Sequence, residues 1–150
     1  MKTVNILMVC LGNICRSPLA EGLLAHKLPS KIFTVDSAGT ATYHTGNPPD
    51  PRSIAVAAKY GIAIDQQKAR PFEKEDFHRF DRIYVMDRSN HNNLKRLEPT
   101  EAEWGKVALL LGDEEVPDPY YGGTEGFEIV YQMIDAATDR IANELLENDH

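Results

Sequence analysis

Eight consecutive residues near the start of the chain have the side chains needed to attack a bound oxyanion. Residues 10–17 are Cys-Leu-Gly-Asn-Ile-Cys-Arg-Ser, so a thiol is followed six residues later by a guanidinium. A guanidinium is a planar fork that binds two phosphate oxygens at once. Ser17 and Pro18 are typical of an N-cap and the first residue of a helix. The helix N-terminus and the N–H groups of the short loop before it would together form an anion site.

Cys10 is the candidate nucleophile of this segment. A helix N-terminus and a nearby cation favour the reactive thiolate, and Ser17 would donate a hydrogen bond to it. We expect attack on phosphorus and capture of the phosphoryl group as a thiophosphate, with Arg16 and the loop N–H groups binding its oxygens. Gly12 and Asn13 are residue types that tolerate the positive φ of a tight loop. A lone cysteine at a strand end is more often simply buried, but this combination of residues favours catalysis.

The hydrophobic pattern predicts the elements that must position these residues, because apolar strand-like runs alternate with helical patterns. Strands are expected at residues 4–9, 32–36, 82–86 and 107–111. Helices are expected at residues 17–28, 52–60, 73–78, 89–97 and 124–147. This alternation predicts a single three-layer α/β domain over residues 1–150, with a four-stranded parallel sheet, helices on both faces and a phosphate-binding loop after the first strand.

Ligands of such sheets bind beyond the carboxyl ends of the strands. Chemistry is therefore expected in residues 10–17, 37–51, 87–90 and 112–123.

Length and composition exclude several classes of function. The 150 residues are 42% hydrophobic and 26% charged, which is typical of one globular domain that needs no disulfide or metal to fold. The net charge of −7 argues against a general nucleic-acid binder. The apolar run at residues 4–11 is too short to span a bilayer, and two cysteines are too few for a secreted disulfide scaffold. We expect a cytoplasmic protein that binds neither nucleic acid nor membrane.

The segment that begins at Cys10 resembles the signature of the low molecular weight protein tyrosine phosphatases, C-x5-R-[ST]. Four further segments resemble the family in the same order, at residues 36–40, 46–50, 86–90 and 118–122. The resemblance implies a phosphatase domain that hydrolyses phosphotyrosine through a cysteinyl-phosphate, without cofactor or metal. It implies that Cys10 and Arg16 are catalytic, and that Asp118 protonates the leaving tyrosine oxygen and then acts as base for water.

The resemblance also assigns the residues around the nucleophile. The phosphate-binding loop would comprise Leu11, Gly12, Asn13, Ile14, Cys15 and Ser17. The backbone of Asn13 is expected to be strained and to be braced by hydrogen bonds, with Ser37 as one partner. Gln67 stands where some members have a histidine in this support shell, so the bracing is expected to differ here.

An aromatic slot is expected to recognise the substrate. Ile14, Tyr43, Tyr120 and Tyr121 would line it, and its depth would favour phosphotyrosine over the shorter phosphoserine. Related protein-arginine phosphatases typically have threonine where this chain has Ile14, which favours tyrosine. The implied partner is a tyrosine-phosphorylated protein, with a tyrosine kinase among the candidates, and inorganic phosphate is the product. Phosphorylation of Tyr120 or Tyr121 itself stays open.

Two questions remain open in the sequence. Cys15 is either the partner of Cys10 in a reversible disulfide that protects the nucleophile, or a small apolar residue packed under the loop. The fold also admits an idle phosphotyrosine-binding module, although such a module would need neither Cys10 nor Asp118. Arsenate reductases of this fold relay oxidation through later cysteines, which are missing after Cys15. The five histidines show no metal-binding spacing.

Overall fold

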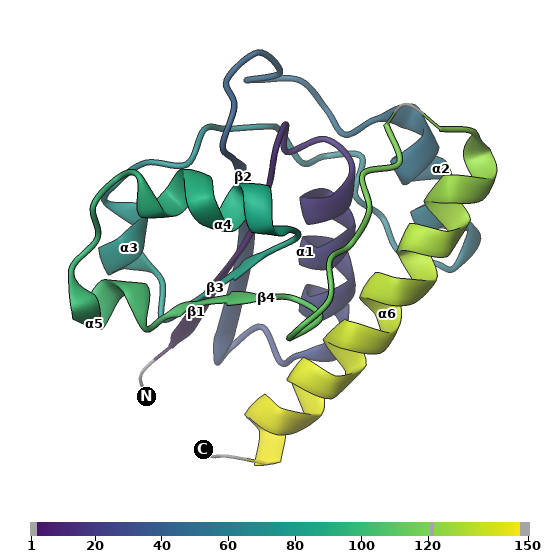
Figure 1. The fold of residues 1–150 in the computed structure, drawn as a ribbon. Coiled ribbons are helices and arrows are strands. Elements are labelled where there is room, and N and C mark those ends of the chain that lie inside the picture. The colour runs from purple at the N-terminus through teal and green to yellow at the C-terminus, as the bar shows by residue number, and fades with distance from the viewer. Residues whose placement is uncertain (1–2, 121, 148–150) are drawn as a thin grey trace.

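The computed structural model describes residues 3–120 and 122–147 and has a four-stranded parallel sheet between two layers of helices (Figure 1). The strands are β1 (Val4–Cys10), β2 (Phe33–Gly39), β3 (Arg82–Val85) and β4 (Val107–Leu109). Their order in the sheet is β2-β1-β3-β4. The helices are α1 (Arg16–Lys27), α2 (Pro51–Lys59), α3 (Asp76–Arg79), α4 (Arg88–Lys95), α5 (Glu101–Trp104) and α6 (Thr124–Glu147). The predicted α/β fold is confirmed.

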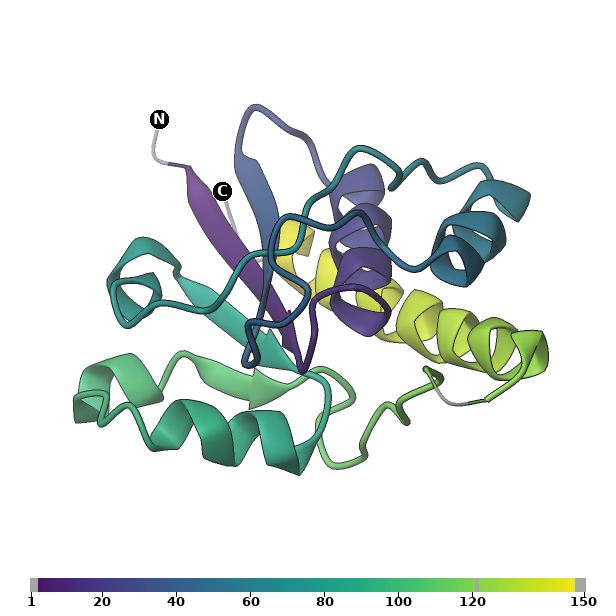
Figure 2. The same cartoon turned by 90° about the horizontal axis from the view of Figure 1, so that it is seen from above.

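Strand β1 is buried on both faces, which explains its nearly continuous apolar sequence. Ile6 and Met8 belong to the core that also includes residues of α1 and α6. Leu7 and Val9 point the other way and pack in a second core with residues of α3 and α4. This alternation is the two-residue period of a strand. Figure 2 shows the result: α1, α2 and α6 lie on one side of the sheet, and α3, α4 and α5 lie on the other.

Several element boundaries differ from those predicted. Strand β2 continues to Gly39, because its pairing with β1 extends as far as Cys10 opposite Gly39. Helix α5 was not predicted; it is short, and its first turn is closed by a capping box in which Thr100 and Glu103 bond each other's backbone. Strand β4 ends at Leu109, two residues earlier than expected.

The loops after the four strands meet at one edge of the sheet. The N–H of Thr40 donates to the carbonyl of Cys10, and that of Ala41 donates to the carbonyl of Leu11, so the loop after β2 packs on the loop after β1. The N–H of Val116 donates to the carbonyl of Met86, which joins the loops after β4 and β3. The parallel sheet thus brings together the segments in which chemistry was expected.

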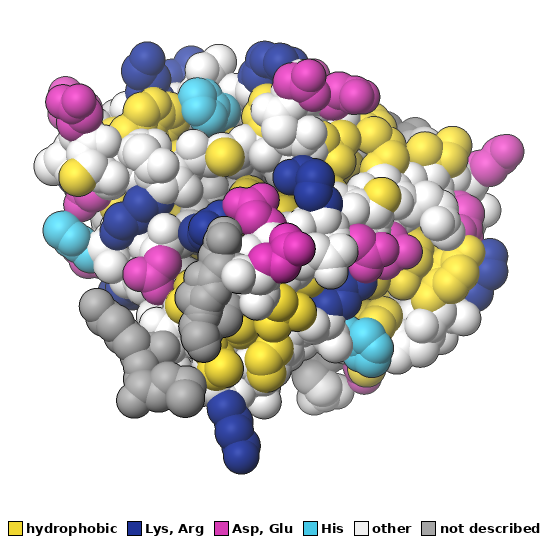
Figure 3. All heavy atoms as spheres, turned by 90° about the horizontal axis from the view of Figure 1, so that it is seen from below, with side chains coloured by type: hydrophobic (Ala, Val, Ile, Leu, Met, Phe, Trp, Pro, Cys, Tyr) yellow, Lys and Arg dark blue, Asp and Glu magenta, His cyan; other side chains and the backbone are white. Residues whose placement is uncertain are grey.

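On the face seen in Figure 3, basic side chains lie among acidic ones rather than in a separate patch. In residues 3–120 and 122–147, no helix has the length and apolar character needed to cross a membrane.

Candidate active site

The segment from the last residue of β1, Cys10, to the first residue of α1, Arg16, is held in a tight curl by Asn13. This residue has a φ of 59°, in the left-handed region that asparagine tolerates better than most side chains. Its amide is bonded at both ends: Nδ2 donates to Ser17 Oγ at 2.8 Å, and Oδ1 accepts from the N–H of Arg70 at 3.0 Å. We call residues 10–16 the phosphate loop.

Gly12 does not adopt the positive φ that its residue type tolerates. The glycine leaves space instead, because a Cβ atom at this position would lie 2.9 Å from Cδ2 of His44 and would require the imidazole to shift. The absence of a side chain lets the imidazole of His44 pack directly against the phosphate loop.

The expected contact between Ser37 and Asn13 is not formed among the described residues. The hydroxyl of Ser37 donates to Glu21 Oε1 at 2.6 Å instead, which joins β2 to α1. Gln67 does not bond Asn13 either; its Nε2 donates to the carbonyl of Pro18 at 3.1 Å. The second brace on Asn13 is the backbone of Arg70, for which the side-chain pattern gives no signal.

Helix α1 begins at Arg16, so Ser17 is not its N-cap as predicted. The N-cap is Cys15, whose side chain makes no capping hydrogen bond. Ser17 lies in the first turn, where its hydroxyl accepts from Asn13 and lies 3.0 Å from the Sγ of Cys10. Because that hydroxyl already accepts one bond, its proton is available to the sulfur. Among the described residues, no side chain caps the N–H groups of the first turn, so these groups are left for an anion.

Arg16 is almost fully buried, with 2% of its surface exposed. Its Nη1 donates to Asp87 Oδ2 at 2.7 Å and to the carbonyl of Val116 at 2.8 Å. Burial alone would lower the pKa of the Arg16 guanidinium, but the charges of Cys10 and Asp87 outweigh it and raise this pKa. The guanidinium is therefore a permanent positive charge in a fixed orientation.

Sequence reasoning missed the role of Asp87. Its Oδ2 accepts from Arg16, and its Oδ1 accepts from the N–H of Asn90 at 2.8 Å and so caps α4. One signal was present, since Asp87 directly follows the third predicted strand in a segment where chemistry was expected.

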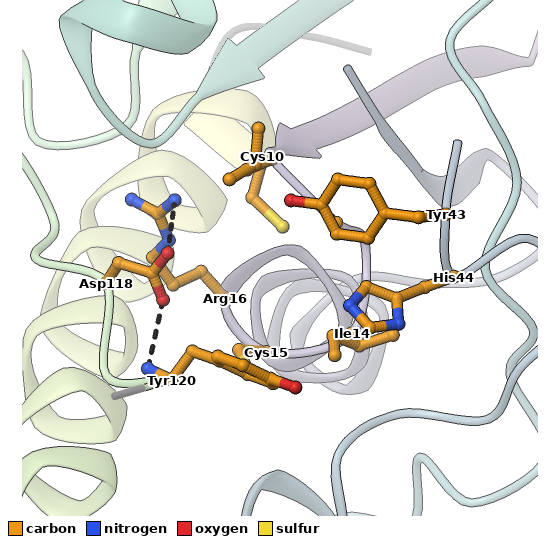
Figure 4. A pocket seen from close by; sticks show the side chains of 10 residues that line it. Cys10, Ile14, Cys15, Arg16, Tyr43, His44, Asp118 and Tyr120 are labelled. Atoms are coloured by element: carbon orange, nitrogen blue, oxygen red, sulfur yellow. Dashed lines mark hydrogen bonds and ion pairs between the residues drawn. The ribbon is translucent and has the colours of Figure 1, made fainter. Parts of the chain in front are cut away.

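Asp118 comes from the loop between β4 and α6, which we call the acid loop (residues 112–123). Its Oδ2 lies 3.8 Å from Arg16 Nη2, and its Oδ1 accepts from the N–H of Tyr120 at 3.0 Å. The carboxylate is about one-third exposed (34%) and borders the same cavity as the thiol of Cys10 (Figure 4). The three predicted catalytic residues thus converge, although they come from two distant segments.

The cavity between these groups is small, with a volume of about 40 Å³, and it opens to solvent. Its lining includes the predicted Ile14, Tyr43 and Tyr120 together with His44, which the sequence did not assign to the site. The His44 ring lies 4.8 Å from that of Tyr43 and 6.0 Å from that of Tyr120, measured between ring centres. His44 thus completes an aromatic rim. The other predicted wall residue, Tyr121, lies outside the described residues.

Cys10 and Cys15 are both free thiols. Burial, followed by the negative charges of Asp50 and Cys10, raises the pKa of the Cys15 thiol to about 12. Cys15 is therefore neutral near pH 7 and packs among apolar side chains of the core. The cavity thus offers a single candidate thiol nucleophile, Cys10. Within the described part of the chain, no group of three or more His, Cys, Asp or Glu residues could hold a metal ion.

Comparison with known proteins gives matches to one family. Residues 5–150 match the family model described as low molecular weight phosphotyrosine protein phosphatase. The chain is 40% identical to a low molecular weight protein-tyrosine-phosphatase of Streptomyces coelicolor, with 91% of this chain and 90% of that protein aligned. It is 43% identical to the low molecular weight phosphotyrosine protein phosphatase of Mus musculus, with 86% and 87% aligned.

Solved structures give the same result. A protein tyrosine phosphatase from Entamoeba histolytica, crystallised with Hepes in its active site, superposes with a TM-score of 0.90 at 35% identity, covering 97% of this chain and 98% of that one. Vibrio vulnificus Wzb in complex with benzylphosphonate superposes with a TM-score of 0.87 at 34% identity, covering 95% and 99%.

Proposed function

The chain belongs to the low molecular weight phosphotyrosine protein phosphatase family and is a protein-tyrosine phosphatase, and we propose that Cys10, Arg16 and Asp118 carry out its reaction. The observation that carries this assignment is the convergence of the three side chains on one cavity. A thiol beside a hydroxyl donor, a buried guanidinium and a partly exposed carboxyl are the groups that a phosphomonoester hydrolase needs.

The first step transfers the phosphoryl group to the enzyme. Cys10 Sγ attacks phosphorus, the S–P bond forms, and the bond from phosphorus to the tyrosine oxygen breaks. Asp118 gives its proton to that oxygen, so the leaving group departs as neutral tyrosine. Arg16 and the phosphate loop N–H groups bind the other three oxygens. Arg16 Nη1 is held by Asp87, which leaves Nη2, on the side of Asp118, for the substrate.

The second step regenerates the enzyme. Asp118 takes a proton from water as the water oxygen attacks phosphorus. The S–P bond breaks, inorganic phosphate leaves, and Cys10 returns as a thiolate. The hydroxyl of Ser17, 3.0 Å from the sulfur, stabilises this leaving thiolate by a hydrogen bond. The cycle needs neither cofactor nor metal, because these residues supply the nucleophile, the acid and the charge.

The aromatic rim selects the substrate in this proposal. Ile14, Tyr43 and Tyr120 would contact the phosphotyrosine ring, with Tyr121 as the predicted fourth wall, and His44 would contact its outer edge. Phosphoserine would be too short to bring its phosphorus to the thiol through such a rim. The partners would be tyrosine-phosphorylated proteins, tyrosine kinases among them. The mechanism requires a reduced thiol, which the cytoplasm would maintain.

Phosphate release tests this assignment. A phosphotyrosine peptide, a phosphoserine peptide and phosphoarginine are compared in EDTA, with wild type, Cys10→Ser and the control Cys15→Ala. We expect release from the phosphotyrosine peptide alone, retained in Cys15→Ala and lost in Cys10→Ser, which should still bind the peptide. Release chiefly from phosphoarginine would preserve the mechanism but contradict the substrate class. Full turnover by Cys10→Ser would show that Cys10 is not the nucleophile.

A further inference from the structure

Arg52, in the first turn of α2, links that helix to the acid loop, beside which α2 lies (Figure 1). Its Nη1 donates to the carbonyl of Gly122 and its Nη2 to the carbonyl of Tyr120, both at 2.9 Å. The guanidinium carbon also lies 5.7 Å from the ring centre of Tyr120 and 4.5 Å from that of Phe127. These distances are within the range of cation–π contacts. One side chain therefore contacts the acid loop and the start of α6 at several points.

Asp50 holds the guanidinium of Arg52 from the other side. Its Oδ1 accepts from Nε and its Oδ2 from Nη2, each at 3.0 Å, and only 8% of Asp50 is exposed. The same carboxylate caps α2 by accepting from the N–H of Arg52 at 2.8 Å. The backbone N–H of Asp50 donates to the carbonyl of Ile14 at 2.8 Å. A continuous path of bonds thus runs from the phosphate loop through Asp50 and Arg52 to the acid loop.

Asp118 lies at the end of this path, since its Oδ1 accepts from the N–H of Tyr120, the residue whose carbonyl accepts from Arg52. We propose that Arg52 is a positioning residue that fixes the acid loop against the phosphate loop, and thereby places the Asp118 carboxyl at the leaving oxygen. This inference rests on the proposed role of Asp118 as general acid. The geometry favours arginine, because three separate nitrogens of Arg52 make four hydrogen bonds, to both carboxylate oxygens of Asp50 and to two carbonyls. The ammonium of lysine has only three N–H groups, all on one nitrogen, and cannot reproduce this set.

Leaving-group dependence distinguishes this role from a merely structural one. A phenol of low pKa departs with little protonation, so p-nitrophenyl phosphate depends on the acid less than phenyl phosphate or a phosphotyrosine peptide does. We expect Arg52→Lys to lower kcat/KM for phenyl phosphate by about tenfold, a fraction of the ~10²–10⁴-fold that general acid catalysis supplies. The loss for p-nitrophenyl phosphate should be clearly smaller. A general loss of folded enzyme would lower kcat/KM for both substrates by the same factor.

Three further variants complete the experiment. Asp50→Asn retains a good N-cap but weakens the hold on Arg52. It should therefore lower the substrate ratio, which is kcat/KM for phenyl phosphate divided by kcat/KM for p-nitrophenyl phosphate, even if Arg52→Lys folds poorly. Arg82→Lys is the matched control, because Arg82 pairs with Glu144 on α6, away from the cavity. In an Asp118→Asn background, Arg52→Lys should change the ratio little further.

The outcomes separate the two proposals. If Asp118→Asn leaves the substrate ratio unchanged, the proposed general acid is wrong. If Asp118→Asn changes the ratio while folded Arg52→Lys and Asp50→Asn do not, the acid stands and the positioning role of Arg52 is wrong.

Discussion

The side chain of Asn13 accepts a hydrogen bond of 3.0 Å from the backbone N–H of Arg70, although 57 residues separate them in the chain. The guanidinium of Arg70 pairs in turn with Asp36 and with Asp76, at 3.2 Å and 3.0 Å. Asp76 is fully buried in the first turn of α3. Asn13, the left-handed residue that shapes the phosphate loop, is therefore fixed to the segment before α3. Helix α3 lies on the opposite side of the sheet from α1.

Replacement of Asn13 separates the cost of its backbone conformation from the value of its hydrogen bonds. Asn13→Ala keeps an unfavourable φ of 59° and loses both amide bonds. Asn13→Gly loses the same bonds without the conformational penalty. We expect urea denaturation to show a loss of about 2 kcal/mol or more for alanine and a smaller loss for glycine. Both variants should bind inorganic phosphate more weakly. Equal stability of the two would contradict the strain argument.

Asp76→Asn tests the ion pair that holds Arg70. The carboxylate of Asp76 also accepts from Arg79 and from the N–H of Glu73, the latter at 2.8 Å. Asparagine can keep the bond to Glu73 but leaves the two guanidinium groups without their buried counter-charge. We expect a loss of about 2 kcal/mol, below the ~3–5 kcal/mol of a fully buried pair because Arg70 is partly exposed.

Glu73→Gln is the control for this experiment. It removes the exposed ion pair of Glu73 with Arg79, and we expect it to cost less than about 1 kcal/mol. If the two variants lose the same free energy of unfolding in this experiment, the buried ion pairs of Asp76 stabilise the fold no more than the exposed pair of Glu73 does, and the prediction is wrong.

Most of the residues proposed for the chemistry could be singled out in the sequence because they lie close together in the chain. Cys10, Arg16 and Ser17 lie within one eight-residue segment, residues 10–17, which runs from the end of β1 to the first turn of α1 and brings them together locally. Asp118 was found through the family resemblance and through its place after a strand. Asp87 was missed because its contact with Arg16 depends on β3 lying beside β1, and the alternation of elements does not determine strand order.

Other errors arose where tertiary contacts override a local rule. Serine before proline favours an N-cap, yet Ser17 bonds Cys10 and Asn13 instead, because the phosphate loop needs its hydroxyl there. The brace from Arg70 uses a backbone N–H, which every residue except proline possesses. His44 has no periodic neighbours and no motif, so its place at the cavity is visible only in the folded structure, where it lies against Gly12 and near the rings of Tyr43 and Tyr120.

The carboxyl of Glu21 makes the stability of the fold depend on pH. Burial raises its pKa from 4.5 to about 7, while the hydrogen bond from Ser37 opposes this shift. An acid with a higher pKa in the folded state destabilises the fold when it ionises. The contribution of Glu21 to the free energy of unfolding should therefore fall as the pH rises from about 4.5 through 7, by on the order of 2 kcal/mol.

Two variants check this assignment by urea denaturation at pH 5 and pH 8. Glu21→Gln should be more stable than wild type at pH 8 and similar to it at pH 5, because glutamine keeps an acceptor for Ser37 but cannot ionise. Ser37→Ala removes a bond that favours the ionised form of Glu21, so the pKa of Glu21 in the folded state should rise further. The fall in the free energy of unfolding with rising pH should then continue to a higher pH than in wild type. A Glu21→Gln variant with no gain at pH 8 would show that the carboxyl ionises freely in the folded protein.

The raised pKa of Cys15 predicts how the enzyme responds to peroxide. Closure of a Cys10–Cys15 disulfide requires the Cys15 thiolate to attack oxidised Cys10, but a thiol with a pKa of about 12 is almost entirely neutral at pH 7. We therefore expect the fraction of activity that dithiothreitol recovers after peroxide to be larger at pH 9 than at pH 7. Cys15→Ala should abolish this pH dependence and recover less at both. Equal recovery in folded wild type and Cys15→Ala would leave Cys15 as a packing residue alone, because protection of Cys10 would then not pass through its thiol.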